Sequence, residues 1–299
     1  MMTDIVWEMP NPLSTLDVRL DADTVTTVRQ HGNPSGTRIL VSHGSGFAAD
    51  LYYPFWSLLA NDYDVMVYDL RNHGWNSVGA RRDHNIPTLV FDHDIILESI
   101  DRVYGNKPTI GIFHSLTSIV AILSCNEIYS ALVLFDPPLA KHDMSQTELL
   151  EAAALMAAKI RQREDHFKSR EEFVEFLKFH PSFKGVSPGV HELMALTTLR
   201  GSESGNGYEL RCPREYEAQL MEYGRSFFPL LDLDLIACPK KIVGADPTLP
   251  HSYLPTLDQR SAYEVDYDFI PETTHLLQLE KPEECVAVTR EFLERHDLA

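Results

Sequence analysis

From Thr37 onward the chain alternates between short apolar segments and longer segments of helical periodicity. The strand candidates are 37–43, 64–70, 109–114 and 131–136, and the helix candidates are 52–60, 86–105 and the segment that starts at Ser115. Strands that alternate with helices are joined by crossover connections, which pair the strands in parallel. The sequence therefore predicts an α/β fold whose mostly parallel sheet is flanked by helices.

Both ends of the chain extend this sheet. Residues 15–32 alternate polar and apolar side chains around a turn at Asp21 to Asp23, as a half-exposed β-hairpin does. Strand candidates return at 239–246 and 263–270, with a helical stretch up to Ala262 between them and a final helix within 282–296. The last strands are thus expected to pair with the sheet that the first ones begin.

Between residues 138 and 232 the alternation stops and helical signals replace it. Four helix starts carry recognisable caps, namely Ser145 with Glu148, Ser169 with Glu172, Ser187 before Pro188, and Pro213. Gly201 and Gly224 are the expected ends of the last two helices. We therefore expect a core formed by residues 1–137 and 233–299, and an all-helical insertion formed by residues 138–232.

Composition narrows the classes of partner. The net charge of −18 and the pI of about 5.1 disfavour binding to nucleic acid or to anionic lipid. No segment approaches the length of a membrane span, and the N-terminal residues lack the pattern of a signal peptide, so we expect a cytoplasmic protein. The four cysteines form no C-x-x-C pair and are expected to be reduced; they are Cys125, Cys212, Cys238 and Cys285.

A polar pair, His114 and Ser115, stands where the strand candidate 109–114 meets the next helix. A serine at such a junction can project from a tight turn, and the helix N-terminus favours developing negative charge there. This junction resembles the nucleophile elbow of the α/β-hydrolase superfamily, which usually reads G-x-S-x-G and would make Ser115 the nucleophile. Phe113 and Thr117 replace the usual small residues, which predicts a crowded elbow.

Two upstream loops resemble the same superfamily. Residues 43–47 (HGSGF) are similar to its glycine-rich loop, which implies an oxyanion hole formed by the backbone N–H groups of Ser45 and Leu116. We expect substrate contacts from Gly46, Phe47 and His114. Residues 68–76 look like its D-x-R-x-H-G segment, whose members are expected to structure a loop through backbone partners; they are Asp69, Arg71, His73 and Gly74.

The acid and the base are expected near the C-terminus. Asp246 follows the strand candidate 239–246, where the superfamily carries the acid that fixes the histidine tautomer. Asp136 at the end of the preceding strand is the alternative acid, although an aspartate beside proline often forms a turn. His275 lies beyond the last strand and before an E-x-P turn, where the superfamily carries its base.

The resemblance implies a serine hydrolase that cleaves a small or medium apolar carboxylic ester, lactone or thioester through an acyl-enzyme. It implies no metal and no organic cofactor. The insertion would be a cap, in which most apolar side chains pack helix on helix and one or two touch substrate. The candidates for that contact are Leu150, Met156, Phe173, Phe176, Leu193, Met194 and Met221.

Other functions stay open from the sequence. Within the same fold, one alternative is a carbon–carbon bond hydrolase with a serine triad, and another is a cofactor-free dioxygenase, which would depend on His275 more than on Ser115. A non-catalytic ligand receptor would need none of the chemistry. A metal site formed by His84, Asp92, His93 and Asp94 is disfavoured, because adjacent residues on a helix do not share one face.

Overall fold

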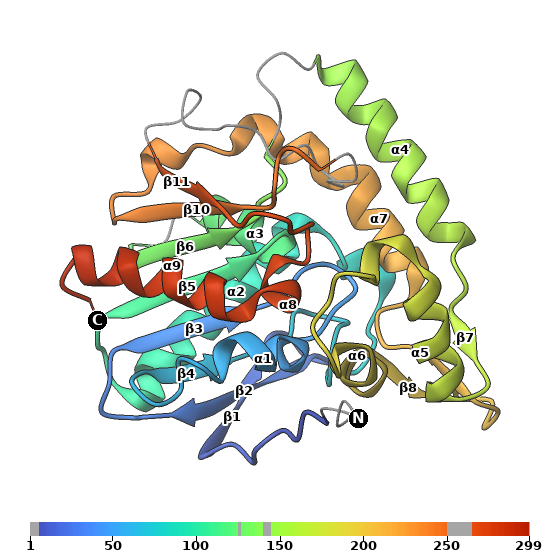
Figure 1. The fold of residues 1–299 in the computed structure, drawn as a ribbon, viewed down its shortest axis with the longest axis horizontal. Coiled ribbons are helices and arrows are strands. Elements are labelled where there is room, and N and C mark those ends of the chain that lie inside the picture. The colour runs from blue at the N-terminus through green and yellow to red at the C-terminus, as the bar shows by residue number, and fades with distance from the viewer. Residues whose placement is uncertain (1–5, 125–126, 140–144, 250–264, 299) are drawn as a thin grey trace.

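An eight-stranded sheet runs through the computed structural model, which describes residues 6–124, 127–139, 145–249 and 265–298 (Figure 1). Its strands are, in spatial order, β1 (Ser14–Arg19), β2 (Val25–Gly32), β4 (Asp64–Val67), β3 (Arg38–Ser42), β5 (Thr109–His114), β6 (Tyr129–Phe135), β10 (Lys240–Gly244) and β11 (Asp266–Phe269). Neighbours pair in parallel from β4 to β11, whereas β2 pairs antiparallel with β1 and β4. The predicted mostly parallel sheet and its N-terminal hairpin are confirmed.

Helices cover both faces of this sheet. They are α1 (Tyr53–Trp56), α2 (Ile86–Tyr104), α3 (Leu116–Ser124), α8 (Leu277–Glu280) and α9 (Pro282–Arg295), with short 3-10 turns η1 (Ala49–Tyr52) and η2 (Arg81–Asp83). Helices α1 and α9 contact each other on the face nearer the viewer in Figure 1, and α2 and α3 contact each other on the opposite face.

The strands are apolar on both sides because both sides are covered. In β3, Ile39 and Val41 pack into the cluster that includes α1 and α9, whereas Leu40 between them packs into the cluster that includes α2 and α3. All three side chains are fully buried. Consecutive residues of a strand thus pack into two different cores, one on each face of the sheet. This packing holds β5 and β6 in place, with polar residues at their C-terminal ends.

The insertion, residues 138–232, connects two strands that are neighbours in the sheet, β6 and β10. It contains α4 (Gln146–Gln162), α5 (Arg170–Phe179), α6 (Val190–Thr198), α7 (Arg214–Gly224) and the 3-10 turns η3 (Pro181–Phe183) and η4 (Arg225–Leu230), with η5 (Leu233–Leu235) just after it. Figure 1 shows these helices gathered at one end of the sheet. The capping box expected at Ser145 and Glu148 is present.

The expectation that the insertion is entirely helical was wrong in one detail. A small antiparallel sheet of β7 (His166–Phe167), β9 (Tyr208–Leu210) and β8 (Leu199–Gly201) joins its helices. Helix α6 ends at Thr198, before the expected Gly201, because Leu199 is extended and pairs with Leu210 in this sheet.

The helical stretch expected up to Ala262 lies mostly outside the described residues. The following strand candidate is confirmed as β11, and the final helix as α9. Within the described ranges, the helices are too short or too polar to cross a membrane.

Candidate active site

Ser115 occupies a strained turn between β5 and α3. Its φ of +50° lies in the left-handed region, which non-glycine residues seldom adopt. The turn is held by a hydrogen bond from the Ser115 N–H to the Phe135 carbonyl and by one from the Ile119 N–H to the Ser115 carbonyl. This backbone matches a nucleophile elbow, which lifts the side chain off the end of the strand.

The elbow is crowded, as predicted, and the chain makes room for both bulky residues. Phe113 lies edge-on to the rings of His93 and Tyr129, on the strand face it shares with Gly111. A Cβ at Gly111 would lie 2.5 Å from the Phe113 ring, so glycine there creates the space that the ring fills. Thr117 is buried and donates a hydrogen bond of 2.6 Å to the His43 carbonyl, which fastens α3 to the loop after β3.

His275 lies between Ser115 and Asp136. Its Nε2 is 2.9 Å from the Ser115 Oγ, and its Nδ1 is 2.6 Å from the Asp136 Oδ2. The side chains of His275 and Asp136 are 16% and 5% exposed, so the pair is largely shielded from water. A carboxylate on Nδ1 holds the proton there and leaves the Nε2 lone pair facing the serine hydroxyl.

The expectation that Asp246 pairs with His275 is therefore wrong, because the carboxylate that contacts the imidazole is that of Asp136. The Asp246 carboxylate accepts hydrogen bonds from the Glu272 N–H at 2.7 Å and from the Thr248 N–H and hydroxyl at 2.9 and 2.7 Å. These donors hold the pKa of Asp246 below its usual range. Asp246 thus anchors the segment that leads to His275, while Asp136, at the end of the adjacent strand β6, receives the imidazole.

The segment that carries His275 has a second anchor in Glu280 of α8. Its carboxylate accepts hydrogen bonds from the N–H and the hydroxyl of Thr274, both at 2.6 Å. Burial raises the pKa of Glu280 in spite of these donors. The residue before the histidine is thus fixed to a helix, which limits the directions that the imidazole can take.

The loop after β3 lies against the elbow. A Cβ at Gly44 would come within 2.8 Å of the His114 ring and 3.3 Å of the Ser115 Cβ, so this close approach requires glycine. Among the hydrogen bonds between described residues, none is donated by the backbone N–H of Ser45 or Leu116. The Ser45 Oγ is buried and also has no partner within the described part of the chain.

A buried chain of hydrogen bonds connects this loop to the histidine segment. The Gly44 N–H donates to the Tyr52 hydroxyl at 3.2 Å, and that hydroxyl donates to the His114 Nδ1 at 2.6 Å. The His114 Nε2 donates to the His275 carbonyl at 2.8 Å. Burial, with the nearby His275, holds the pKa of His114 well below its usual range, so the ring is neutral and can make both bonds.

A cavity of about 60 Å³ adjoins Ser115 and His275. Its other walls come from the core and from α7 and η4 of the insertion; they are Ser45, Ile86, Leu116, Ile119, Pro138, Leu220, Met221, Gly224, Arg225 and Phe228. Among the candidates from the insertion, Met221 lines this cavity, while Phe173, Leu193 and Met194 are buried in the core. Within the described residues, the expected contacts Gly46, Phe47 and His114 are not part of its lining, and His114 is buried beneath the elbow.

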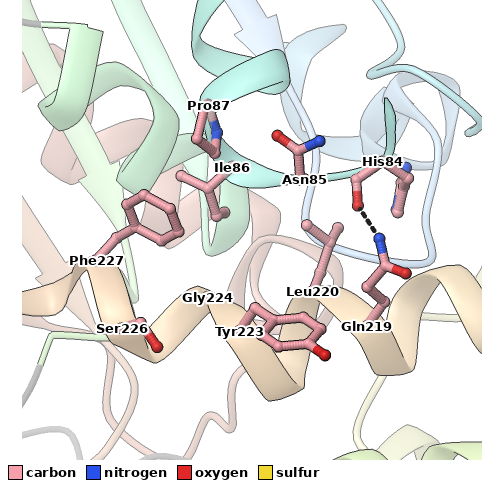
Figure 2. Close-up of a pocket in the computed structure, with 10 residues that line it drawn as sticks. All are labelled: His84, Asn85, Ile86, Pro87, Gln219, Leu220, Tyr223, Gly224, Ser226 and Phe227. Carbon is pink, nitrogen blue, oxygen red and sulfur yellow. Dashed lines mark hydrogen bonds between the residues drawn. The ribbon is translucent and has the colours of Figure 1, made fainter. Parts of the chain in front are cut away.

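A larger cavity of about 380 Å³ lies beside the first (Figure 2). Figure 2 shows α7 along one side of it and the start of α2 along the other, with the Phe227 ring pointing toward Ile86. The two cavities share Ile86, Leu220 and Gly224 in their linings. These three residues therefore form the partition between the Ser115 cavity and a mostly apolar neighbour.

The segment that resembles D-x-R-x-H-G structures its loop, as expected. The Asp69 carboxylate accepts from the N–H groups of Ala49 and Trp75, and a Cβ at Gly74 would collide with it at 2.2 Å. Arg71 makes a bidentate pair with Asp92 at 2.7 Å. Asp92 is thus engaged, and His93 lies between two tyrosine hydroxyls, so these two residues do not meet His84 in a metal site.

Comparison with known proteins agrees with this architecture. A poly(3-hydroxyalkanoate) depolymerase from Ectopseudomonas oleovorans is 30% identical over 104 residues, which span 35% of this chain and only 36% of that protein. E-2-(acetamidomethylene)succinate hydrolase superposes with a TM-score of 0.76 at 16% identity, covering 94% of this chain and 99% of that one. A thioesterase domain from the curacin biosynthetic pathway superposes with a TM-score of 0.71 at 16% identity, with the same coverage. A sequence profile described as the alpha/beta hydrolase family matches residues 39–288, and the chain belongs to that family.

Proposed function

We propose that this chain is a serine hydrolase that cleaves a small or medium apolar carboxylic ester, lactone or thioester through an acyl-enzyme. The observation that carries the proposal is the continuous path from the Ser115 Oγ through both ring nitrogens of His275 to Asp136. The strained φ of Ser115 supports it, because strain is retained where a side chain must be presented at a fixed angle.

The proposed reaction begins when His275 accepts the Ser115 proton at Nε2 and the Ser115 Oγ attacks the substrate carbonyl carbon. The negative charge on the carbonyl oxygen is stabilised by the N–H groups of Ser45 and Leu116. His275 then donates its proton to the leaving group, and Asp136 stabilises the imidazolium meanwhile. Water, activated by the same histidine, releases the acyl group and restores the serine.

The substrate class follows from the cavity walls and from the named relatives. Ile86, Ile119 and Leu220 surround the space next to Ser115 and favour an apolar acyl group. A depolymerase of a polyester and a thioesterase both cleave acyl bonds, which is consistent with an oxygen or thiol ester here. The insertion acts as a cap in this proposal, because α7 and η4 close one side of the cavity and exclude water.

Labelling with a fluorophosphonate probe tests the proposal. We expect one labelled serine, Ser115, and loss of labelling in Ser115→Ala and His275→Ala. A panel of p-nitrophenyl esters, lactones and acyl thioesters then measures turnover. Absence of labelling in the folded protein contradicts a serine hydrolase. Labelling of Ser115 without turnover of any ester, lactone or thioester would instead favour a carbon–carbon bond hydrolase.

A further inference from the structure

His73, His84 and Cys212 come together in the interior, although they lie far apart in the sequence. One potential ligand atom from each lies within 4.8 Å of the other two. The two histidines are 0% exposed and the cysteine 2% exposed. His73 comes from the loop after β4, His84 directly follows η2, two residues before α2, and Cys212 comes from the insertion just before α7.

Two nitrogen atoms in this cluster are buried without a hydrogen-bond partner. Across the part of the chain that the structure describes, the Nε2 atoms of His73 and His84 have none. The His73 Nδ1 donates to the Arg71 carbonyl at 2.9 Å, which leaves the Nε2 lone pair unused. Buried polar groups are nearly always paired, so these two unpaired Nε2 atoms, in a cluster that includes a thiol, indicate a site for a ligand.

We propose that His73, His84 and Cys212 bind a zinc ion. Two imidazole nitrogens and a thiolate are ligands that zinc prefers, and three protein ligands leave one position of the tetrahedron for water or a nearby carboxylate. The bond from the His73 Nδ1 to a backbone carbonyl is the outer contact that orients a ligating histidine. Ligand atoms around tetrahedral zinc lie about 3.5 Å apart, so atoms that are within 4.8 Å of one another need to approach by at most about 1.3 Å on binding.

Zinc binding requires one proton to leave and one to move. The Cys212 thiol loses its proton to solvent and binds as the thiolate. The His84 Nδ1 accepts from the Asn72 amide at 3.1 Å, so its proton resides on Nε2 before zinc binds. On binding, the proton moves to Nδ1 and the amide turns over to accept it. The Gly79 N–H, which donates to that amide at 2.6 Å, is on an exposed residue and can turn to water.

The site would fasten the insertion to the core. The two are already joined here by a hydrogen bond from the Tyr216 hydroxyl to the Gly79 carbonyl at 2.8 Å. A second, from the Gln219 amide to the His84 carbonyl at 2.9 Å, is drawn in Figure 2. His84 is part of the lining of the larger cavity, so the cluster lies next to one end of that cavity. The buried Glu217 carboxylate, which is paired with Arg163, acts electrostatically on both His73 and Cys212.

Metal titration of the purified chain tests the proposal. After treatment with a chelator, we expect one equivalent of Zn²⁺ to bind and to raise the unfolding temperature. Cobalt(II) in its place should give tetrahedral visible bands and a thiolate-to-cobalt charge-transfer band. Cys212→Ser should lose that band and weaken zinc binding at least ~100-fold, because a ligand matters at least as much as its outer-shell partners. Cys238→Ser, which alters a half-buried thiol elsewhere, should change neither.

Two results overturn the proposal. The first is a wild-type protein that binds no zinc or gives a cobalt spectrum without the thiolate band, which decides the matter even if Cys212→Ser fails to fold. The second is unchanged zinc affinity in Cys212→Ser. Ser115→Ala should bind zinc as the wild type does, so the outcome is independent of whether the chain hydrolyses esters.

Discussion

The His275 Nδ1 lies 2.6 Å from the Asp136 Oδ2, so the carboxylate at the end of β6, and not the one after β10, orients the imidazole. Asp136→Asn should therefore lower kcat by about 10³- to 10⁴-fold, because an amide stabilises the wrong tautomer and cannot balance the imidazolium. Steady-state kinetics on the best ester from the panel measures this loss.

Asp246→Asn is the matched control for that variant. It weakens bonds to the Glu272 N–H and to Thr248, so we expect a lower free energy of unfolding and only a small change in kcat. Thermal unfolding and kinetics measured together separate the two effects. If Asp246→Asn proves to be the inactive variant, Asp136 is not the acid.

Most of the architecture could be predicted from the sequence because it depends on local periodicity and on turn chemistry. Ser115 and His275 could be placed because each stands in a recognisable local context. The sequence favoured Asp246 over Asp136 as the partner of His275, which was wrong; local context separates the two poorly, since both follow parallel strands that are neighbours in the sheet. The decision rests on where the loop with His275 folds back, which the anchors to Glu280 and Asp246 determine.

Other features of the site could not be predicted because they depend on contacts between residues far apart in the sequence. The bond from His114 to the His275 carbonyl joins residues 161 positions apart, and the sequence marked His114 only as a substrate contact. The role of the Tyr52 hydroxyl could not be predicted, because a tyrosine in an apolar helical segment is expected to be a core residue. The hydroxyl meets His114 only because the fold packs η1 against β5.

Tyr52→Phe removes two buried hydrogen bonds, each worth about 1–1.5 kcal/mol, and should slow the reaction by at least about tenfold, mainly in kcat. The variant leaves the His114 Nδ1 and the Gly44 N–H without their shared partner. The loop after β3 and the segment that carries His275 therefore both lose an anchor. If Tyr52 positions His275, the pH profile of kcat/KM should shift in the variant. If Tyr52 has only a structural role, the pH profile should stay as in the wild type. Tyr53→Phe, at a half-buried position nearby, is the control.

Ser45→Ala tests whether the Ser45 hydroxyl assists its own backbone N–H. The Ser45 Oγ is buried at the cavity that contains Ser115, and it lacks a partner within the described residues. A donor aimed at the developing oxyanion contributes about 10²-fold to kcat, so a loss of that order with little change in KM is expected. Thermal stability should be unchanged. An unaltered kcat restricts the oxyanion hole to backbone donors.

Ile86→Ala should shift the preference toward longer acyl chains. Ile86 is shared by the two cavities, so its truncation opens the 60 Å³ space at Ser115 toward the 380 Å³ space beside it. Each further methylene that gains a place in an apolar pocket favours the longer ester by about tenfold in kcat/KM. Ile100→Ala in the same helix removes a similarly buried side chain away from both cavities, and should destabilise the protein without changing the chain-length profile.

The free energy of unfolding should fall as the pH drops from about 6.5 toward 4. Burial lowers the pKa of His31 to about 4 and the pKa values of His43 and His93 to about 3. In that window the unfolded chain binds protons that the folded chain excludes, and each such histidine steepens the dependence by up to about 1.4 kcal/mol per pH unit. His31→Phe keeps an aromatic ring against Trp56 and removes one of these groups, so urea unfolding across the window should show a slope lower by about one proton. An identical slope in the variant would mean that His31 is protonated in the folded chain as readily as in the unfolded one.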